Sequence, residues 1–238
     1  MTALLVTGTG TGVGKTVVTA AIAALGVDRG ARVTVLKPAQ TGEPVGAPGD
    51  AEQVVRLAGA VRTVELVRYP DPLSPEAAAR RSGLPALTLD ACVAAVRAAD
   101  AESDLVLVEG AGGLLVRYDD AGLTIADVAA ALSLPVVLVT AAGLGTLNAT
   151  TLTLEAMRAR GLTLHGLVVG AWPADPGLAE RCNLTDLRTL VGGPLAGVLP
   201  DGSGGLDPAR FLTLARAGLA PDLGGDFDES AFCARESA

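Results

Sequence analysis

Histidine, cysteine and aromatic residues are scarce in this sequence. Its 238 residues include one histidine, His165, and only 3% Phe, Trp and Tyr, so the core must be aliphatic. His165 lies in a strand-forming run without acidic or metal-binding neighbours, which favours a structural role over catalysis. Cys92, Cys182 and Cys233 are widely spaced and form no CxxC pair. Neither a zinc site nor a disulfide framework is therefore indicated.

Long apolar runs and clustered positive charge are also missing. No stretch of about eighteen apolar residues occurs, and the N-terminus enters a short apolar strand without a basic leader. We therefore expect a soluble protein of the cytoplasm, a reducing compartment, with no membrane partner. The formal net charge of −8 argues against a nucleic-acid partner, because binding a polyanion over a broad surface requires clustered Lys and Arg.

Short apolar runs alternate with Ala- and Leu-rich helical patterns. The runs expected to form strands are residues 4–6, 33–36, 105–108, 136–139 and 167–169. Continuous apolar strands are usually covered on both faces, so the pattern predicts an α/β fold, a mainly parallel sheet with helices on both faces. The chain can bury one sizeable core, and we expect a single domain over residues 1–221. Residues 222–238, with five acidic residues and little apolar pattern, are expected to form a flexible tail.

The first apolar run leads into the glycine-rich segment GTGTGVGKT, residues 8–16, and then into a helical pattern. Glycines let backbone N–H groups approach phosphate oxygens, and the helix N-terminus adds partial positive charge. Lys15 would neutralise the β and γ phosphates, and Thr16 would bind Mg²⁺. The strict GxxxxGK[ST] pattern needs a glycine at Thr9, and the dinucleotide pattern GxGxxG fails at Val13. The segment is thus a variant phosphate loop and predicts a single-domain P-loop NTPase fold.

Lysine is confined to Lys15 and Lys37, whereas sixteen of the eighteen basic residues are arginine. Both positions are candidates for sites that need a compact ammonium. Lys37 ends a predicted buried strand, where an ammonium must meet an anion or reach solvent. Glu109 ends another such strand, at the sheet edge where α/β ligand crevices open. Together with Thr16 and Asp50 it forms an all-oxygen set suited to Mg²⁺, although Asp50 alone could be an ordinary helix N-cap.

These segments resemble the dethiobiotin synthetase family over most of the chain. The family's phosphate loop GTxTxVGKT, its KPxxSG element and its VEGAGG turn correspond to residues 8–16, 37–42 and 108–113, and GLGTLN at 143–148 is also similar. The resemblance implies an enzyme of biotin biosynthesis that closes the ring of dethiobiotin from 7,8-diaminopelargonate and CO₂. It also implies ATP as co-substrate, Mg²⁺, and a homodimer with substrate near the subunit interface.

The resemblance assigns roles to individual residues of this chain. The catalytic residues it implies are Lys37, Lys15 and Thr11, and the metal ligands are Thr16, Asp50 and Glu109. Nucleotide binding is expected at Gly12, Val13, Gly14, Lys15, Thr16, Val17, Asp50, Glu109, Gly110, Ala111, Gly112, Gly170, Ala171 and Pro200. Substrate binding is expected at Thr41, Gly143, Leu144 and Asn148. By residue type alone, 110–113 could be a plain turn and Asn148 a helix cap.

One position departs from the family. Where an asparagine commonly reads adenine, this chain has Gly170, followed by Ala171 and Trp172. Glycine has no side-chain amide to select a base edge, so we predict loose base specificity, with CTP, GTP or UTP accepted beside ATP. Trp172 could stack on a base, but packing is the favoured role.

Two other functions remain open. One is a regulatory switch ATPase of the partitioning or cell-division type, which the absence of an extra lysine early in the loop disfavours. The other is a nucleotide-binding domain without chemistry, against which the joint presence of Lys37, Thr41, Asp50 and Glu109 weighs. The Gly- and Pro-rich segment 42–49 could be a mobile flap over the site or a plain surface loop.

Overall fold

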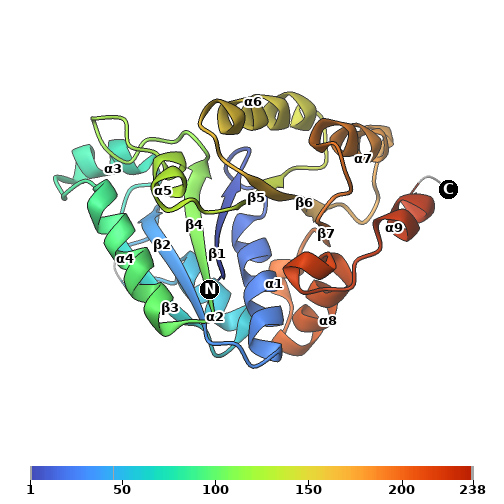
Figure 1. Ribbon diagram of the computed structural model, residues 1–238, viewed down its shortest axis with the longest axis horizontal. Coiled ribbons are helices and arrows are strands. Elements are labelled where there is room, and N and C mark those ends of the chain that lie inside the picture. Colours follow the sequence, from blue (N-terminus) through green and yellow to red (C-terminus); the bar gives the residue numbers. More distant parts are fainter. Residues whose placement is uncertain (1, 45, 237–238) are drawn as a thin grey trace.

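A single parallel sheet organises the chain (Figure 1). The computed structural model describes residues 2–44 and 46–236, and within these ranges seven strands lie in the order β3-β2-β4-β1-β5-β6-β7, with every pairing parallel. The strands are β1 (Thr2–Gly8), β2 (Val33–Thr41), β3 (Arg62–Tyr69), β4 (Leu105–Gly113), β5 (Val136–Thr140), β6 (Leu164–Trp172) and β7 (Gly197–Pro200). Parallel neighbours need crossover connections, which helices supply here.

Helices cover both faces of the sheet. They are α1 (Lys15–Asp28), α2 (Asp50–Ala58), α3 (Pro75–Ser82), α4 (Leu89–Glu102), α5 (Ile125–Leu132), α6 (Thr146–Ala159), α7 (Leu178–Val191), α8 (Pro208–Gly218) and α9 (Glu229–Glu236), with short 3₁₀ turns η1 (Ser203–Gly205) and η2 (Pro221–Leu223). One apolar cluster joins α1, α2 and α8, a second joins α4 to α7 and α9, and a small third cluster lies between α3 and strands β2 and β3. Figure 1 shows α6 beside α7 and α1 beside α8. None of these helices, over the ranges described, has the length and apolar character needed to span a bilayer.

The predicted fold class is confirmed, and each of the five apolar runs lies inside a strand. Each run contains a fully buried leucine, with Leu5, Leu36, Leu107, Leu138 and Leu167 at most 1% exposed. The sequence patterns missed β3 and β7. β3 has the sequence RTVELVRY, in which charged residues interrupt the apolar pattern, as is common in an edge strand that is paired on one side only. β7 has only four residues, which is too short for a clear pattern.

Strand β2 is longer than expected, which changes the position of Lys37. Lys37 was expected at the end of this strand, but β2 continues to Thr41, so Lys37 lies in the middle of the strand. Pairing with β4 ends at Leu36, whereas pairing with β3 continues to Thr41. Pro38 has no N–H to donate, and it is tolerated because β2 is no longer paired with β4 at that point.

The C-terminal segment differs from the expected flexible tail. Residues 221–223 and 229–236 form η2 and α9, and Phe227 and Phe232 are each only 9% exposed. The Phe232 ring meets Trp172 edge to face at 5.6 Å, and Trp172 Nε1 donates a hydrogen bond to Glu236 at 3.1 Å. The favoured packing role of Trp172 is thus confirmed. Residues 237 and 238 lie outside the described residues.

Candidate functional site

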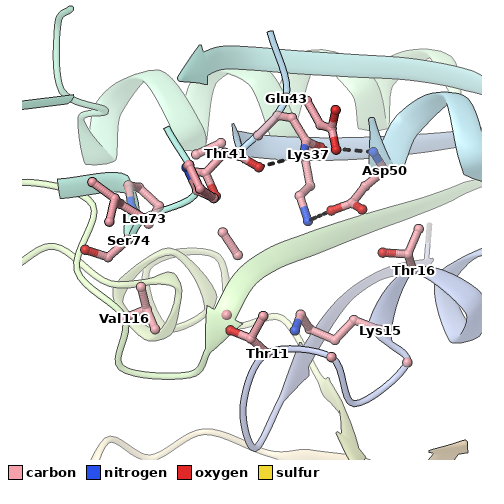
Figure 2. Close-up of a pocket in the computed structure, with 18 of the residues that line it drawn as sticks. Thr11, Lys15, Thr16, Lys37, Thr41, Glu43, Asp50, Leu73, Ser74 and Val116 are labelled. Atoms are coloured by element: carbon pink, nitrogen blue, oxygen red, sulfur yellow. Dashed lines mark hydrogen bonds and ion pairs between the residues drawn. The ribbon is translucent and has the colours of Figure 1, made fainter. Parts of the chain in front are cut away.

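A cavity of about 690 Å³ opens at the carboxyl edge of the sheet, where parallel α/β folds bind ligands (Figure 2). The phosphate loop, the end of β2, the start of α2 and the turn after β4 contribute to its walls. The lining includes most of the residues predicted for the site: Thr11, Gly12, Gly14, Lys15, Thr16, Val17, Lys37, Thr41, Asp50, Ala111 and Gly112.

The phosphate loop has the backbone of an anion cradle. Gly12 and Gly14 have φ of +76° and +95°, a left-handed conformation that favours glycine, and Gly14 is the N-cap of α1. The first turn of α1, whose N–H groups have no acceptor within the helix, lines the cavity with Lys15, Thr16 and Val17. Lys15 Nζ donates a hydrogen bond to the Gly10 carbonyl at 2.9 Å. Burial, together with the positive charge of Lys37, lowers the pKa of Lys15 below its ordinary value, and a bound anion would offset both effects.

Lys37 is held between two carboxylates. Its Nζ lies 2.5 Å from Asp50 Oδ2 and 2.9 Å from Glu109 Oε1, and Figure 2 shows the side chain pointing from β2 toward Asp50. The side chains of Lys37 and Glu109 are only 4% and 1% exposed. Burial alone would lower the pKa of Lys37, but Glu109 and Asp50 outweigh it and raise that pKa well above its ordinary value. The expectation that this ammonium meets an anion is confirmed.

Three oxygen groups converge where a metal ion was predicted. Thr16 Oγ1 donates to Glu109 Oε1 at 2.9 Å, while Glu109 Oε2 is buried and receives no hydrogen bond from any described residue. Burial alone would raise the pKa of Asp50, but Lys37 and Thr16 lower it, so Asp50 is an anion. The described residues contain no group of three His, Cys, Asp or Glu side chains arranged around a metal. A site with two carboxylates, one hydroxyl and a buried oxygen without a hydrogen bond from the described residues suits Mg²⁺, because this ion keeps several waters and binds substrate phosphates.

Asp50 occupies the first turn of α2, after the N-cap Gly49. The alternative of an ordinary N-cap is therefore wrong for its side chain, which pairs with Lys37. Its backbone N–H donates to Gln40 Oε1 at 3.0 Å, so a β2 side chain occupies the capping position. The position of the Asp50 carboxylate consequently depends on contacts between α2 and β2.

Several lining residues were not predicted. They are Ala39, Gln40, Glu43, Pro72, Leu73, Ser74, Pro75 and Val116. Gln40 and Glu43 lie within or next to the quoted segment 37–42, whereas 72–75 follow β3, the strand that the apolar patterns missed. A correct assignment of β3 would have placed the sequence PLSP at the carboxyl edge of the sheet.

Other predicted residues lie outside the cavity lining. Val13, Glu109 and Gly110 are buried behind it, and Gly170, Ala171 and Pro200 lie on β6 and β7. The residues predicted to bind the substrate, Gly143, Leu144 and Asn148, belong to the turn after β5 and the start of α6. Asn183 of α7 fixes this turn by donating to the Ala142 and Gly143 carbonyls at 2.7 and 3.1 Å. Leu144 at the tip is 91% exposed.

Gly170 is in close backbone contact with the phosphate loop. A Cβ at Gly170 would lie 2.1 Å from the Val13 carbonyl oxygen, and one at Gly14 would lie 2.4 Å from the Gly170 carbonyl oxygen. Distances below 3.0 Å to backbone atoms cannot be relieved by a side-chain rotation. Strand β6 therefore supports the loop directly, and any side chain at Gly170 would displace it.

Gly170→Ala is expected to lower the free energy of unfolding by about 1–3 kcal/mol, the usual range for overpacking. It should also weaken nucleotide binding, because the loop must shift. Urea unfolding and nucleotide titration measure the two effects. Gly193→Ala is the matched control, since no described atom lies within 4 Å of its Cβ position. Equal stability of the two variants would contradict the proposed close contact.

The chain is similar to known proteins over almost its whole length. A family model described as "AAA domain" matches residues 2–204. The chain is 60% identical to the ATP-dependent dethiobiotin synthetase BioD of Frankia casuarinae over 99% of both chains. It is 61% identical to the protein of the same name from Saccharopolyspora erythraea, over 94% of this chain and 98% of that one. Among solved structures, the septum site-determining protein MinD of Pyrococcus horikoshii, complexed with Mg-ADP, is similar, with a TM-score of 0.56 and 15% identity over 96% and 97% of the two chains. At that identity the likeness concerns the fold alone.

Proposed function

Because the chain belongs to the dethiobiotin synthetase family, we propose that it closes the ureido ring of dethiobiotin in biotin biosynthesis. The substrates are 7,8-diaminopelargonate, CO₂ and a nucleoside triphosphate, with ATP indicated by the names of the relatives. The main structural support is the pair Lys15 and Lys37, the two lysines of the chain, on the walls of one cavity beside the phosphate loop.

The proposed reaction has three steps. One amine of the substrate attacks CO₂ and loses a proton, which gives a carbamate. A carbamate oxygen then takes the γ-phosphoryl group of the triphosphate, and the nucleoside diphosphate leaves. Finally the second amine attacks the carbonyl carbon of this mixed anhydride and loses a proton, phosphate leaves, and the ring closes. Negative charge accumulates on phosphoryl and carbamate oxygens, so stabilising it matters more than a histidine base.

The charged groups of the cavity match these demands. Lys15, near the loop backbone at Gly10, would neutralise the β and γ phosphates. Lys37 would contact the carbamate and the transferring phosphoryl group, and Thr11 would contribute a hydroxyl beside them. Thr16, Asp50 and Glu109 would hold Mg²⁺, which when bound neutralises phosphate charge and orients the triphosphate.

The substrate site is proposed to be shared between two copies of the chain. Thr41 lines the cavity, whereas Gly143, Leu144 and Asn148 lie on a separate turn whose tip, Leu144, is 91% exposed. A large apolar side chain so exposed, next to residues proposed for substrate binding, supports a homodimer in which one copy contributes this turn to the other. Light scattering tests the proposal. A mass of 23.7 kDa at assay concentrations would be that of a monomer and would contradict the homodimer.

Base selection is proposed to be loose. Gly170 offers no side-chain amide, and its close contact with Val13 leaves no space for one. Initial rates with ATP, CTP, GTP and UTP should therefore differ by much less than about a thousandfold, a discrimination that requires hydrogen-bonded recognition of the base. A preference for ATP of that size would refute this proposal.

A product assay tests the function as a whole. The protein is incubated with diaminopelargonate, bicarbonate and Mg-ATP, and dethiobiotin is detected by mass. Formation of dethiobiotin with equimolar nucleoside diphosphate is expected. Nucleotide hydrolysis without this product would favour a switch ATPase, and binding without turnover would favour a domain without chemistry.

A further inference from the structure

Arg68 of β3 is fixed in an unusually complete set of contacts. Its Nε and Nη2 donate to the two Glu65 carboxylate oxygens, each at 2.7 Å, and its Nη1 donates to the Ala47 carbonyl at 2.6 Å. The side chain is only 12% exposed. A bidentate pair fixes both the position and the plane of a guanidinium, so Arg68 connects β3 rigidly to the segment before α2.

The same guanidinium reaches the residues next to Asp50. Its Nη2 lies 3.4 Å from Glu52 Oε2, and this oxygen accepts the Gly49 N–H at 2.8 Å. A Cβ at Gly49 would lie 3.1 Å from Arg68 Nη2 and 2.9 Å from the Gln40 side chain. Gly49 is therefore enclosed between Arg68 and Gln40.

Gln40 completes the support from the other side. Its Oε1 accepts the Asp50 N–H at 3.0 Å, and its Nε2 donates to the Thr41 carbonyl at 3.1 Å. The residue is 5% exposed, so these contacts are protected from water. The backbone from Ala47 to Asp50 is thus held from both β2 and β3.

We propose that Arg68 is a positioning residue for the metal site. By anchoring Ala47 and, through Glu52, the N–H of Gly49, it sets the start of α2 and directs the Asp50 carboxylate toward Thr16 and Glu109. Arg68 is not among the described residues that line the cavity, so it acts through Asp50 without touching the reactants. The inference rests on the proposed role of Asp50 as a metal ligand.

Arg68→Met tests the inference, because it keeps an apolar stem and removes the guanidinium. The affinity of the protein for Mn²⁺, in the presence of a non-hydrolysable ATP analogue, is measured by electron paramagnetic resonance. It should fall about tenfold or more, the usual effect of removing a partner behind a metal ligand. Arg68→Lys should also bind Mn²⁺ more weakly than the unmodified protein, since an ammonium cannot reproduce the planar fork. In turnover, the Mg²⁺ concentration for half-maximal rate should rise while kcat recovers at saturating Mg²⁺.

Arg32→Met is the matched control. Arg32 also makes a two-point contact with a carboxylate, that of Asp104, with distances of 3.1 and 2.8 Å, but it lies just before β2, at the opposite edge of the sheet. Its Mn²⁺ affinity should be unchanged.

One outcome would overturn the role of Arg68, and another concerns Asp50. Unchanged Mn²⁺ affinity in Arg68→Met, with or without a loss of thermal stability, rejects the inference. If Arg68→Met does not fold, unchanged affinity in Arg68→Lys rejects it instead. Asp50→Asn is the reference: unchanged Mn²⁺ affinity there rejects the metal site itself, and with it the premise of the inference.

Discussion

Replacing Lys37 by alanine is expected to lower kcat by about a hundredfold or more, the usual effect of removing one preorganised charge donor. The Lys37 ammonium is buried, and Glu109 and Asp50 raise its pKa, so it is cationic throughout the working pH range. Because Lys37 is proposed to contact groups that become charged during phosphoryl transfer, nucleotide affinity should change only modestly. Steady-state rates at saturating substrates and calorimetric titration of the nucleotide measure the two quantities.

The second lysine provides the comparison. Lys15 lies within the phosphate loop and is proposed to contact the bound triphosphate before the reaction, so Lys15→Ala should weaken nucleotide binding as well as turnover. Circular dichroism of both variants checks that the sheet is intact. An unchanged kcat in Lys37→Ala would reject the role of that residue, whatever its effect on stability.

The sequence predicted the parts of the fold and site that depend on local patterns. Strands β1, β2, β4, β5 and β6 were found because strands buried on both faces are continuously apolar. The phosphate loop was found because its glycines and the pair Lys15 and Thr16 occupy fixed positions between a strand and a helix. Glu109 was predicted from its place at the end of an apolar strand and Asp50 mainly from the family resemblance, and the structure places both against Lys37.

The remainder depends on contacts between distant segments. Edge strand β3 carries Arg62, Glu65 and Arg68 among its apolar residues, and no local pattern shows that Arg68 meets Ala47. The close approach of Gly170 to the phosphate loop likewise depends on how β6 packs beside it. The apolar partners of the segment 222–236 are likewise distant in sequence, because Phe232 meets Trp172 of β6 only in the fold, and Phe227 packs against Phe232.

The second large effect concerns stability and the buried pair of Lys37 and Glu109. Glu109→Leu leaves the Lys37 ammonium with Asp50 as its remaining carboxylate partner, and the Asp50 side chain is 37% exposed. Removing one member of a buried ion pair is expected to lower the free energy of unfolding by about 3–5 kcal/mol. Urea denaturation of the metal-free and nucleotide-free protein measures this loss.

The double variant Lys37→Met/Glu109→Leu identifies the cause. If the instability of Glu109→Leu arises because the buried Lys37 ammonium has lost one of its two carboxylate partners, removing the ammonium as well should restore most of the lost stability, because apolar side chains of similar size often replace a buried pair without loss. Both variants lose the Thr16 contact to Glu109, so that contact cannot explain a difference between them. If the loss of stability in the double variant equals the sum of the losses in Glu109→Leu and in Lys37→Met, packing around β2 and β4 is disturbed instead. We expect the double variant to recover stability but not turnover. This result would show that the two charges are needed for activity and not for folding.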